Sequence, residues 1–180
     1  VCREVLAASR LAHFHLPNWA RRLLPVAADL GLTISCDLQD VTSADDPYRK
    51  DFVDHADVLF FSAANHGDPT PLIEAFLKPK PDRIVIAGMG SEGCALGTSQ
   101  GMRRFPALDG DAPVVDTNGA GDALAVGFLT SRMLDGYSLE DSVLRGQIAA
   151  RYACTRKASS SDLVTLSRLE EEYRRRSGCR

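Results

Sequence analysis

The first half of the chain alternates short apolar runs with stretches whose apolar residues repeat at helical spacing. Short apolar runs are typical of buried strands, and a period of roughly 3.6 residues indicates a helix. Strands that alternate with helices predict an α/β fold with a mostly parallel sheet. We expect Gly31 to stop one helix and the strand after it to end at Asp37. The predicted elements are a helix at 2–9, a strand at 11–16, a helix at 18–30, a strand at 32–36, a strand within 54–61, a helix at 71–77 and a strand at 83–87.

The hydrophobic pattern changes in the second half of the chain. Two short segments joined by residues 97–101 predict a hairpin over 94–105, which would be a local antiparallel excursion of the sheet. A loop rich in proline, aspartate and glycine follows at 106–113. Helical spacing then returns. The helices predicted here are one that follows a glycine-rich loop and continues to 134, one at 138–154 and one at 165–176.

Length and charge limit the kinds of partner. The 180 residues are 44% hydrophobic, which is enough for one core and too few for two full-sized domains, so we expect a single domain over 1–180. A net charge of -3 gives no basic excess that would attract nucleic acid or an anionic membrane surface. The apolar stretches fall well below the roughly 20 residues that cross a bilayer. These observations predict small-molecule partners, no nucleic acid and no membrane.

The cysteines bear on the redox compartment of the protein, and the first residues bear on where its sequence begins. Five cysteines are dispersed and never form a C-x-x-C pair, so the sequence predicts neither a disulfide framework nor a zinc site. A reducing cytoplasm fits this usage best. The sequence opens at Val1 without methionine and shows no apolar signal core, and we expect residues upstream of Val1 to be missing.

A loop of small residues, Asp-Thr-Asn-Gly-Ala-Gly-Asp at 116–122, opens the first helix of the second half. The backbone N–H groups of Gly119, Ala120 and Gly121 and the positive end of the helix dipole would converge on an anion. A carboxylate beside a phosphate is repulsive unless it has a task, and Asp122 could accept a proton from an attacking hydroxyl. Alternatively, Asp122 is a first-turn acid favoured by the helix dipole. Spacing alone leaves both interpretations open.

This loop, together with Gly127-Phe128-Leu129, resembles the second signature of the ribokinase-like (PfkB) carbohydrate kinases, D-T-x-G-A-G-D. The resemblance implies a three-layer α/β domain with a mostly parallel sheet. It implies that Asp122 is the catalytic base and that residues 119–121 form an anion hole for phosphoryl oxygens. Asp116 and Asn118 match positions that help hold a monovalent cation such as K⁺ in many family members. Asp116 could equally be a loop acid satisfied by backbone amides.

A second glycine string, Gly88-Met-Gly90-Ser-Glu-Gly93, follows a predicted strand and matches G-x-G-x-x-G. A dinucleotide site would need a helix to start at these glycines, whereas the pattern here predicts a strand entering a turn. The string also resembles the family segment V-T-x-G-x-x-G that runs under the nucleotide before a hairpin. Gly88 stands where many members carry threonine, so only backbone contact to the nucleotide could remain there.

Three further positions match segments that lie near ATP in the family. Ser62 and Asn65 stand where members often place an N-x-x-E pair, and Gln147 falls where some members contact the nucleotide. Because Asn65 offers only a neutral carbonyl oxygen, Mg²⁺ would be held mainly by ATP, with Asp68 as a substitute ligand. Ser62 and Asn65 could instead simply cap the following turn. Residues 155–158 resemble the segment that closes the site.

The resemblance covers the later portion of a longer family pattern. Family members begin with a sheet, a small lid and a Gly-Gly motif that supply most sugar contacts, so these residues do not name the sugar. The prediction is an ATP-dependent and Mg²⁺-dependent sugar kinase whose partners are a sugar and ATP, with a homodimer left open. A nucleoside kinase of the same family and an inactive nucleotide-binding remnant are the alternatives. We expect the 180 residues alone to bind ATP weakly without efficient turnover.

Overall fold

The computed structural model describes residues 1–157 and 162–178. The chain divides into two compact units, Val1–Phe105 and Pro106–Arg180. The single domain expected over 1–180 stays a prediction. Among the described residues, no helix is long and apolar enough to span a bilayer.

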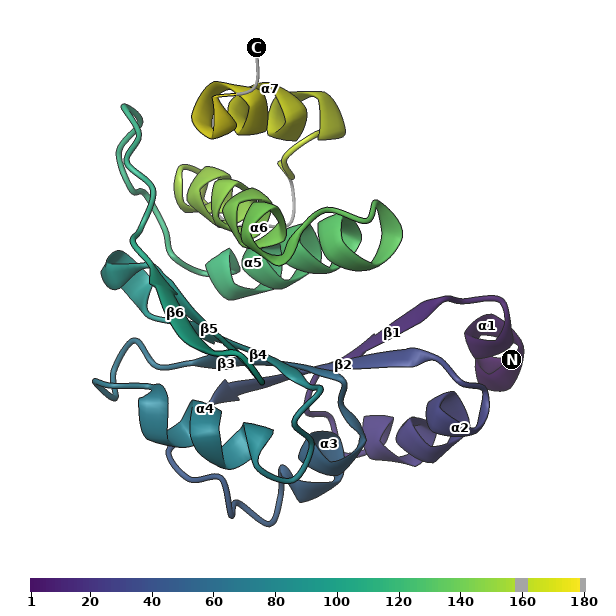
Figure 1. Cartoon of the computed structure of the whole chain (residues 1–180). Coiled ribbons are helices and arrows are strands. Elements are labelled where there is room, and N and C mark those ends of the chain that lie inside the picture. The colour runs from purple at the N-terminus through teal and green to yellow at the C-terminus, as the bar shows by residue number, and fades with distance from the viewer. Residues whose placement is uncertain (158–161, 179–180) are drawn as a thin grey trace. The chain divides into compact units, whose positions relative to one another are not determined.

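The first unit is built on a six-stranded sheet with the order β1-β2-β3-β4-β5-β6. The pairings from β1 to β4 are parallel, and those of β4 with β5 and β5 with β6 are antiparallel. In Figure 1 the helices α2, α3 and α4 lie along one face of this sheet. The predicted α/β class, the mostly parallel sheet and the hairpin are therefore confirmed. The elements are α1 (Cys2–Ala7), β1 (Leu11–Phe14), η1 (Ala20–Leu23), α2 (Leu24–Asp29), β2 (Thr33–Asp40), α3 (Lys50–His55), β3 (Val58–Ser62), α4 (Thr70–Leu77), β4 (Ile84–Gly88), η2 (Gly90–Glu92), β5 (Cys94–Thr98) and β6 (Gly101–Phe105).

Apolar side chains of the strands and helices form the core of this unit. Phe52 of α3 and Leu59 of β3 are completely buried, and each such side chain stabilises the fold by about 1.5–3 kcal/mol. The α4 helix packs directly on Gly97 of β5. A Cβ at Gly97 would lie only 2.1 Å from Cγ2 of Ile73, so this close contact requires glycine. The parallel strands and this close helix contact together fix where the strand ends lie.

Some sequence-based boundaries in this unit are wrong, and the strand expected at 11–16 already ends at Phe14 as β1. The strand expected to end at Asp37 continues as β2 to Asp40, with a register shift against β3 between these two residues. The shift is a bulge in which Gln39 has a φ of 55° and donates its N–H to Oδ1 of Asp37 at 2.7 Å. The α3 helix was not predicted. It begins at Lys50 and ends at His55, inside the range 54–61 where a strand was expected. One turn and a half is too short to show a helical period, so the sequence pattern does not reveal this helix.

The second unit consists of helices: α5 (Ala120–Leu129), the π-helical turn η3 (Thr130–Leu134), α6 (Leu139–Cys154) and α7 (Leu166–Ser177). The start sites of α6 and α7 follow the side-chain capping that the sequence offers. Ser138 Oγ accepts the N–H of Asp141 at 3.1 Å, and Thr165 Oγ1 accepts that of Arg168 at 3.4 Å. All three predicted helices are therefore confirmed.

A buried arginine joins α6 to α7. Arg145 is 1% exposed, and its Nη1 lies 2.7 Å from Oε1 of Glu170. Its guanidinium carbon lies 4.2 Å from the ring centroid of Tyr137, which also donates its hydroxyl to Glu170 at 3.3 Å. A charge this deeply buried needs a paired and hydrogen-bonded partner, so Glu170 and Tyr137 determine how α7 packs on α6.

A second buried arginine, Arg83, joins α3 to α4 in the first unit. It is 2% exposed, and burial lowers the pKa of its guanidinium. Nε donates to the carbonyl of Ala56 at 2.9 Å, Nη1 donates to that of Phe76 at 2.7 Å, and Nη2 donates to that of Val53. These carbonyls belong to the C-terminal ends of the two helices, where the helix dipole favours a positive charge.

We predict that Arg83→Met lowers the free energy of unfolding by about 3 kcal/mol or more, because the carbonyls at two helix ends lose a charged donor and stay buried. Urea denaturation of the whole chain, followed by circular dichroism, measures the change. Lys50→Met is the control, since Lys50 lies in an exposed pair with Asp54 at 2.7 Å. Equal midpoints for the two variants would show that Arg83 does not hold α3 and α4 together.

Candidate active site

The glycine-rich loop of the second unit leads directly into α5. Gly119 is the N-cap of the helix and has a φ of 77°, a left-handed value that favours glycine. Ala120 donates its N–H to the carbonyl of Thr117 at 3.2 Å, and Ala123 donates to that of Gly119 at 2.9 Å. The N–H groups between these two bonds belong to the first helical turn, which by geometry has no intrahelical acceptor for them. With the positive end of the helix dipole, they form a site suited to an anion.

The side chains around this helix start leave the backbone accessible. Gly121 is exposed, and a Cβ on it would meet nothing within 4 Å. Asp122 follows in the first turn and is exposed too. The structure therefore brings the predicted anion-binding residues and the predicted base together on one helical turn. The chemical roles assigned to them stay predictions.

The beginning of the same loop lies against the C-terminal end of α6. Val115 and Asp116 donate their N–H groups to the carbonyl of Cys154, at 2.8 and 3.3 Å. Oδ1 of Asp116 accepts the N–H of Asn118 at 3.0 Å, which makes an Asx turn. Burial, with a smaller contribution from the charge of Asp116, raises the pKa of the Cys154 thiol. Asp116 thus has the backbone contact expected of a loop acid, and the cation role of Asp116 and Asn118 stays a prediction.

The helix that carries the loop is held by an unusually close crossing with α6. A Cβ on Gly127 would lie 2.9 Å from Cα of Gly146 and 3.0 Å from Cβ of Ala149. A Cβ on Gly146 would lie 2.8 Å from the carbonyl oxygen of Leu124. Real Cβ atoms do not approach backbone this closely, so both positions must be glycine for the two helices to pack in this way.

The other set of predicted site residues lies in the first unit, at the carboxyl ends of β3 and β4. Ser62 at the end of β3 is paired with Gly88 at the end of β4, and Ala63 donates its N–H to the Gly88 carbonyl at 2.8 Å. A Cβ on Gly90 would lie 3.4 Å from Cβ of Ala64. The loops that follow the two strands are therefore neighbours. The carboxyl ends of parallel strands are where open α/β sheets bind ligands.

The second glycine string forms a tight turn and does not open a long helix. Gly90 has a φ of 60° and Gly93 a φ of 96°, both left-handed. Met89 donates its N–H to the carbonyl of Gly93 at 2.8 Å, which closes the turn around η2 before β5 begins. The dinucleotide interpretation needs a long helix to start at these glycines, and the described chain has a single 3₁₀ turn (Gly90–Glu92) followed by the strand β5.

The polar residues after β3 offer little to a metal ion. Asn65 is exposed in the loop. Oδ1 of Asp68 accepts both the hydroxyl of Thr70 at 2.6 Å and the guanidinium of Arg104 at 2.5 Å. The hydrogen bond from the Thr70 hydroxyl is the main cause that lowers the pKa of Asp68. Asp68 therefore binds Thr70 at the start of α4 and pairs with Arg104, which argues against its proposed use as a magnesium ligand.

Gln147 lies on α6 and is 8% exposed. Its Nε2 donates to the carbonyl of Pro106 at 2.8 Å, so the side chain contacts the loop that precedes the glycine-rich one. A nucleotide contact from Gln147 stays a prediction. Of the predicted closing segment 155–158, the first three residues follow α6, and Ala158 lies outside the described residues.

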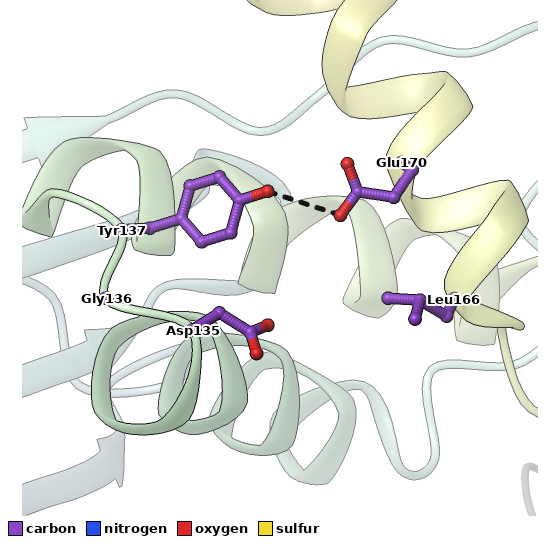
Figure 2. Close-up of a pocket in the computed structure, with 5 residues that line it drawn as sticks. All are labelled: Asp135, Gly136, Tyr137, Leu166 and Glu170. Carbon is purple, nitrogen blue, oxygen red and sulfur yellow. Dashed lines mark hydrogen bonds between the residues drawn. The ribbon is translucent and has the colours of Figure 1, made fainter.

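A surface pocket of about 430 Å³ lies elsewhere in the second unit (Figure 2). The helical run from Ala120 to Leu134 separates the glycine loop from this pocket, and a helix of that length spans about 20 Å. The Tyr137 hydroxyl and the Glu170 carboxylate face each other across the pocket in Figure 2. The pocket therefore belongs to the packing of α7 and lies apart from the candidate active site. Its lining residues are Asp135, Gly136, Tyr137, Leu166 and Glu170.

A family model described as pfkB family carbohydrate kinase matches residues 52–166. The matched range includes the turn at 88–93, the loop at 116–122 and the whole of α6. The chain belongs to the pfkB family of carbohydrate kinases. The resemblance drawn from the sequence is therefore confirmed.

Curated relatives cover most of this pfkB chain. It is 34% identical over 139 residues to the acarbose 7(IV)-phosphotransferase of Actinoplanes sp., which covers 76% of this chain and 46% of that protein. It is 34% identical over 163 residues to the ATP-dependent ribose-1-phosphate kinase of Halopiger xanaduensis, which covers 84% of this chain and 53% of that protein. The pfkB chain therefore spans about half the length of the curated relatives that it matches.

Solved structures of pfkB-type kinases have the same fold. A microbiome-derived acarbose kinase is 30% identical and superposes with a TM-score of 0.85, covering 95% of this chain and 58% of that one. The ribokinase of Arabidopsis thaliana, complexed with ribose and ATP, is 18% identical with a TM-score of 0.78, over 95% of this chain and 58% of that one. At that identity the likeness shows the fold alone. The predicted ribokinase-like α/β class is thus confirmed.

We predict that Gly127→Ala lowers the free energy of unfolding by about 1–3 kcal/mol, because the methyl group forces α5 away from the backbone of α6. Thermal denaturation of the whole chain measures this loss. Gly121→Ala is the control on the same helix, since its Cβ meets nothing within 4 Å. An unchanged melting temperature for Gly127→Ala would mean that the helix crossing yields without cost.

Proposed function

We propose that this chain carries the ATP side and the catalytic base of an ATP-dependent sugar kinase. The observation that supports this most directly is the start of α5, where Gly119 turns the chain and Asp122 stands exposed one turn later. An anion site and a carboxylate on one helical turn can hold a phosphoryl group and accept a proton beside it.

In the proposed reaction Asp122 accepts the proton of a sugar hydroxyl as its oxygen attacks the γ-phosphorus of ATP. The bond from that phosphorus to the bridging oxygen breaks, and ADP leaves. The N–H groups of Gly119 and Gly121 donate to the phosphoryl oxygens, whose negative charge is shared in the transition state, while that of Ala120 already donates to the Thr117 carbonyl at 3.2 Å. The open space at Gly121 fits an anion because no side chain occupies it. Electrostatic stabilisation and positioning would therefore supply most of the catalysis.

Asn65 and Asp68, the two candidates after β3, offer little to a protein-bound Mg²⁺. Asn65 is neutral, and the Asp68 carboxylate is engaged by Thr70 and Arg104. We therefore propose that Mg²⁺ is held mainly by ATP oxygens and water, which suit this ion. Asp116 and Asn118 are our candidates for contact with a monovalent cation such as K⁺. We propose Ser62, Gly88, Gly90, Gly93 and Gln147 as the nucleotide-side contacts.

The acceptor is proposed as a sugar hydroxyl, since relatives at 30% identity or more are named for acarbose and ribose 1-phosphate. The experiment below also tests two alternatives. A solved nucleoside kinase from Methanocaldococcus jannaschii shares the fold at 20% identity and a TM-score of 0.73. A nucleotide-binding protein without turnover would keep the glycine loop and would not need the carboxylate of Asp122.

We predict that Asp122→Asn lowers kcat by about 10²–10⁴-fold, because an amide keeps the shape of the carboxylate and cannot accept the hydroxyl proton. ATP affinity stays level or rises slightly, since a negative charge beside the γ-phosphate is removed. The protein is expressed with any coding sequence that precedes Val1. A coupled assay measures kcat with acarbose, ribose 1-phosphate, ribose and inosine, and calorimetry measures ATP binding.

Asp135→Asn is the matched control for this experiment, because Asp135 is an exposed acid at the far end of the same helical run. A kcat for Asp122→Asn within a few-fold of wild type would contradict the mechanism. Turnover of inosine without any sugar would favour the nucleoside kinase, and ATP binding with no acceptor turned over would favour the inactive protein.

We also predict that Gly121→Ala weakens ATP binding by about tenfold or more while the chain stays as stable as wild type. The added methyl group occupies the open space where a phosphate would approach the backbone, and it touches no part of the protein. Calorimetry and thermal denaturation on the same sample separate the two effects. Unchanged ATP affinity would place the nucleotide elsewhere.

A further inference from the structure

One face of α6 contacts the segment that leads from β6 to the glycine-rich loop. Gln147 and Arg151 are four residues apart, so they lie on the same side of the helix. Gln147 Nε2 donates to the carbonyl of Pro106 at 2.8 Å. Arg151 Nη2 donates to the carbonyl of Gly110 at 3.1 Å and also to that of Ala112. These donors come from successive turns of the helix and meet acceptors in the same order along the segment.

The C-terminal end of α6 completes this row. Cys154 lies on the same face, three residues after Arg151, and its carbonyl accepts the N–H groups of Val115 and Asp116 at 2.8 and 3.3 Å. The order of contacts from 147 to 154 on the helix thus matches the order from 106 to 116 on the segment. We call this set of contacts the α6 clamp. It ends at Asp116, the first residue of the glycine-rich loop.

The segment depends on these contacts because residues 106–117 form neither helix nor strand in the structure. Its path is therefore set by the side chains that bind its carbonyls. A hydrogen bond from a charged donor is roughly twice as strong as one between neutral groups, so Arg151 is the strongest part of the clamp. Arg176 of α7 adds one further contact, to the carbonyl of Asp109 at 2.7 Å.

Gly110 is matched to the Arg151 side chain. A Cβ on Gly110 would lie 3.3 Å from both Nε and Nη2 of Arg151, which is tighter than an ordinary contact. Glycine lets the guanidinium lie against the backbone, where it donates to the carbonyls of Gly110 and Ala112. The contact can therefore be disturbed from either side, on the helix or on the loop.

We propose that Arg151 is a positioning residue for the glycine-rich loop. Arg151 fixes the segment on α6 at residues 110–112. Residues 115–116 can then bind the C-terminal end of α6, and the start of α5 at 119–122 is held in a single position. The consequence for catalysis rests on the proposed kinase function, because only there does the position of Asp122 matter. A displacement of about 1 Å in such a group can lower a rate about 10²-fold.

Hydrogen exchange of the whole chain tests the clamp without any assay of activity. Arg151→Ala should raise the exchange rates of the Val115 and Asp116 amides by about tenfold or more, while the buried Ile148 amide of α6 exchanges as in wild type. Arg175→Ala is the control, since Arg175 pairs with Glu172 on the exposed face of α7. Unchanged exchange at Val115 and Asp116, or equal acceleration throughout the second unit, would overturn the proposal.

Kinetics on an acceptor that the wild type phosphorylates test the catalytic consequence. Arg151→Ala should lower kcat about 10–100-fold and raise the KM for ATP by less than the roughly tenfold loss expected of Gly121→Ala, because the loop loses its fixed position while the proposed contacts at Gly88, Gly90 and Gly93 remain. Gly110→Ala should have a smaller effect of the same kind, and Arg151→Lys should recover part of the rate with one carbonyl contact. A kcat for Arg151→Ala equal to wild type overturns the role. If no acceptor is phosphorylated, the proposed function fails, and hydrogen exchange alone decides on the clamp.

Discussion

The backbone contact between Gly127 of α5 and Gly146 of α6 is the constraint on which the second unit depends. The missing side chains let the two helices approach until a Cβ on either glycine would meet backbone atoms at 2.8–2.9 Å. Because interiors pack as densely as crystals, this contact leaves α5 little freedom to shift or rotate. The position of the helix start, and with it the direction of its N–H groups, follows from a contact two turns away.

The same principle recurs in the first unit. The loops after β3 and β4 meet where Gly90 faces Ala64, and α4 lies directly on the sheet at Gly97. At these two positions the glycine lets a side chain of the neighbouring segment, Ala64 or Ile73, lie directly against the backbone. A protein that must present N–H groups to a phosphate needs such exposed backbone, and it needs rigid elements to carry it. Both units meet these needs with glycine turns at the ends of regular elements.

Much of the fold was predictable because local rules and tertiary packing agree. The helices that begin after Ser138 and Thr165 have side-chain caps, and the hairpin over 94–105 has glycine at its turn. The differences from the sequence-based elements have one tertiary cause and one local cause. The bulge between Asp37 and Asp40 depends on pairing with a neighbouring strand, and α3 is too short to show a period of its own.

By itself, the sequence determined the chemistry that a short motif can carry: a helix start of small residues at 119–121, an acid at Asp122, and the family to which both belong. Only the tertiary structure decided what Arg83, Arg145 and Arg151 do. Two of these arginines bind backbone carbonyls far away in the sequence, at separations such as 27 and 41 residues. Every residue has a carbonyl, so no pattern of side chains marks the one that will be bound. Packing alone selects it, by bringing that carbonyl within reach of the guanidinium, which is buried at Arg83 and partly exposed at Arg151.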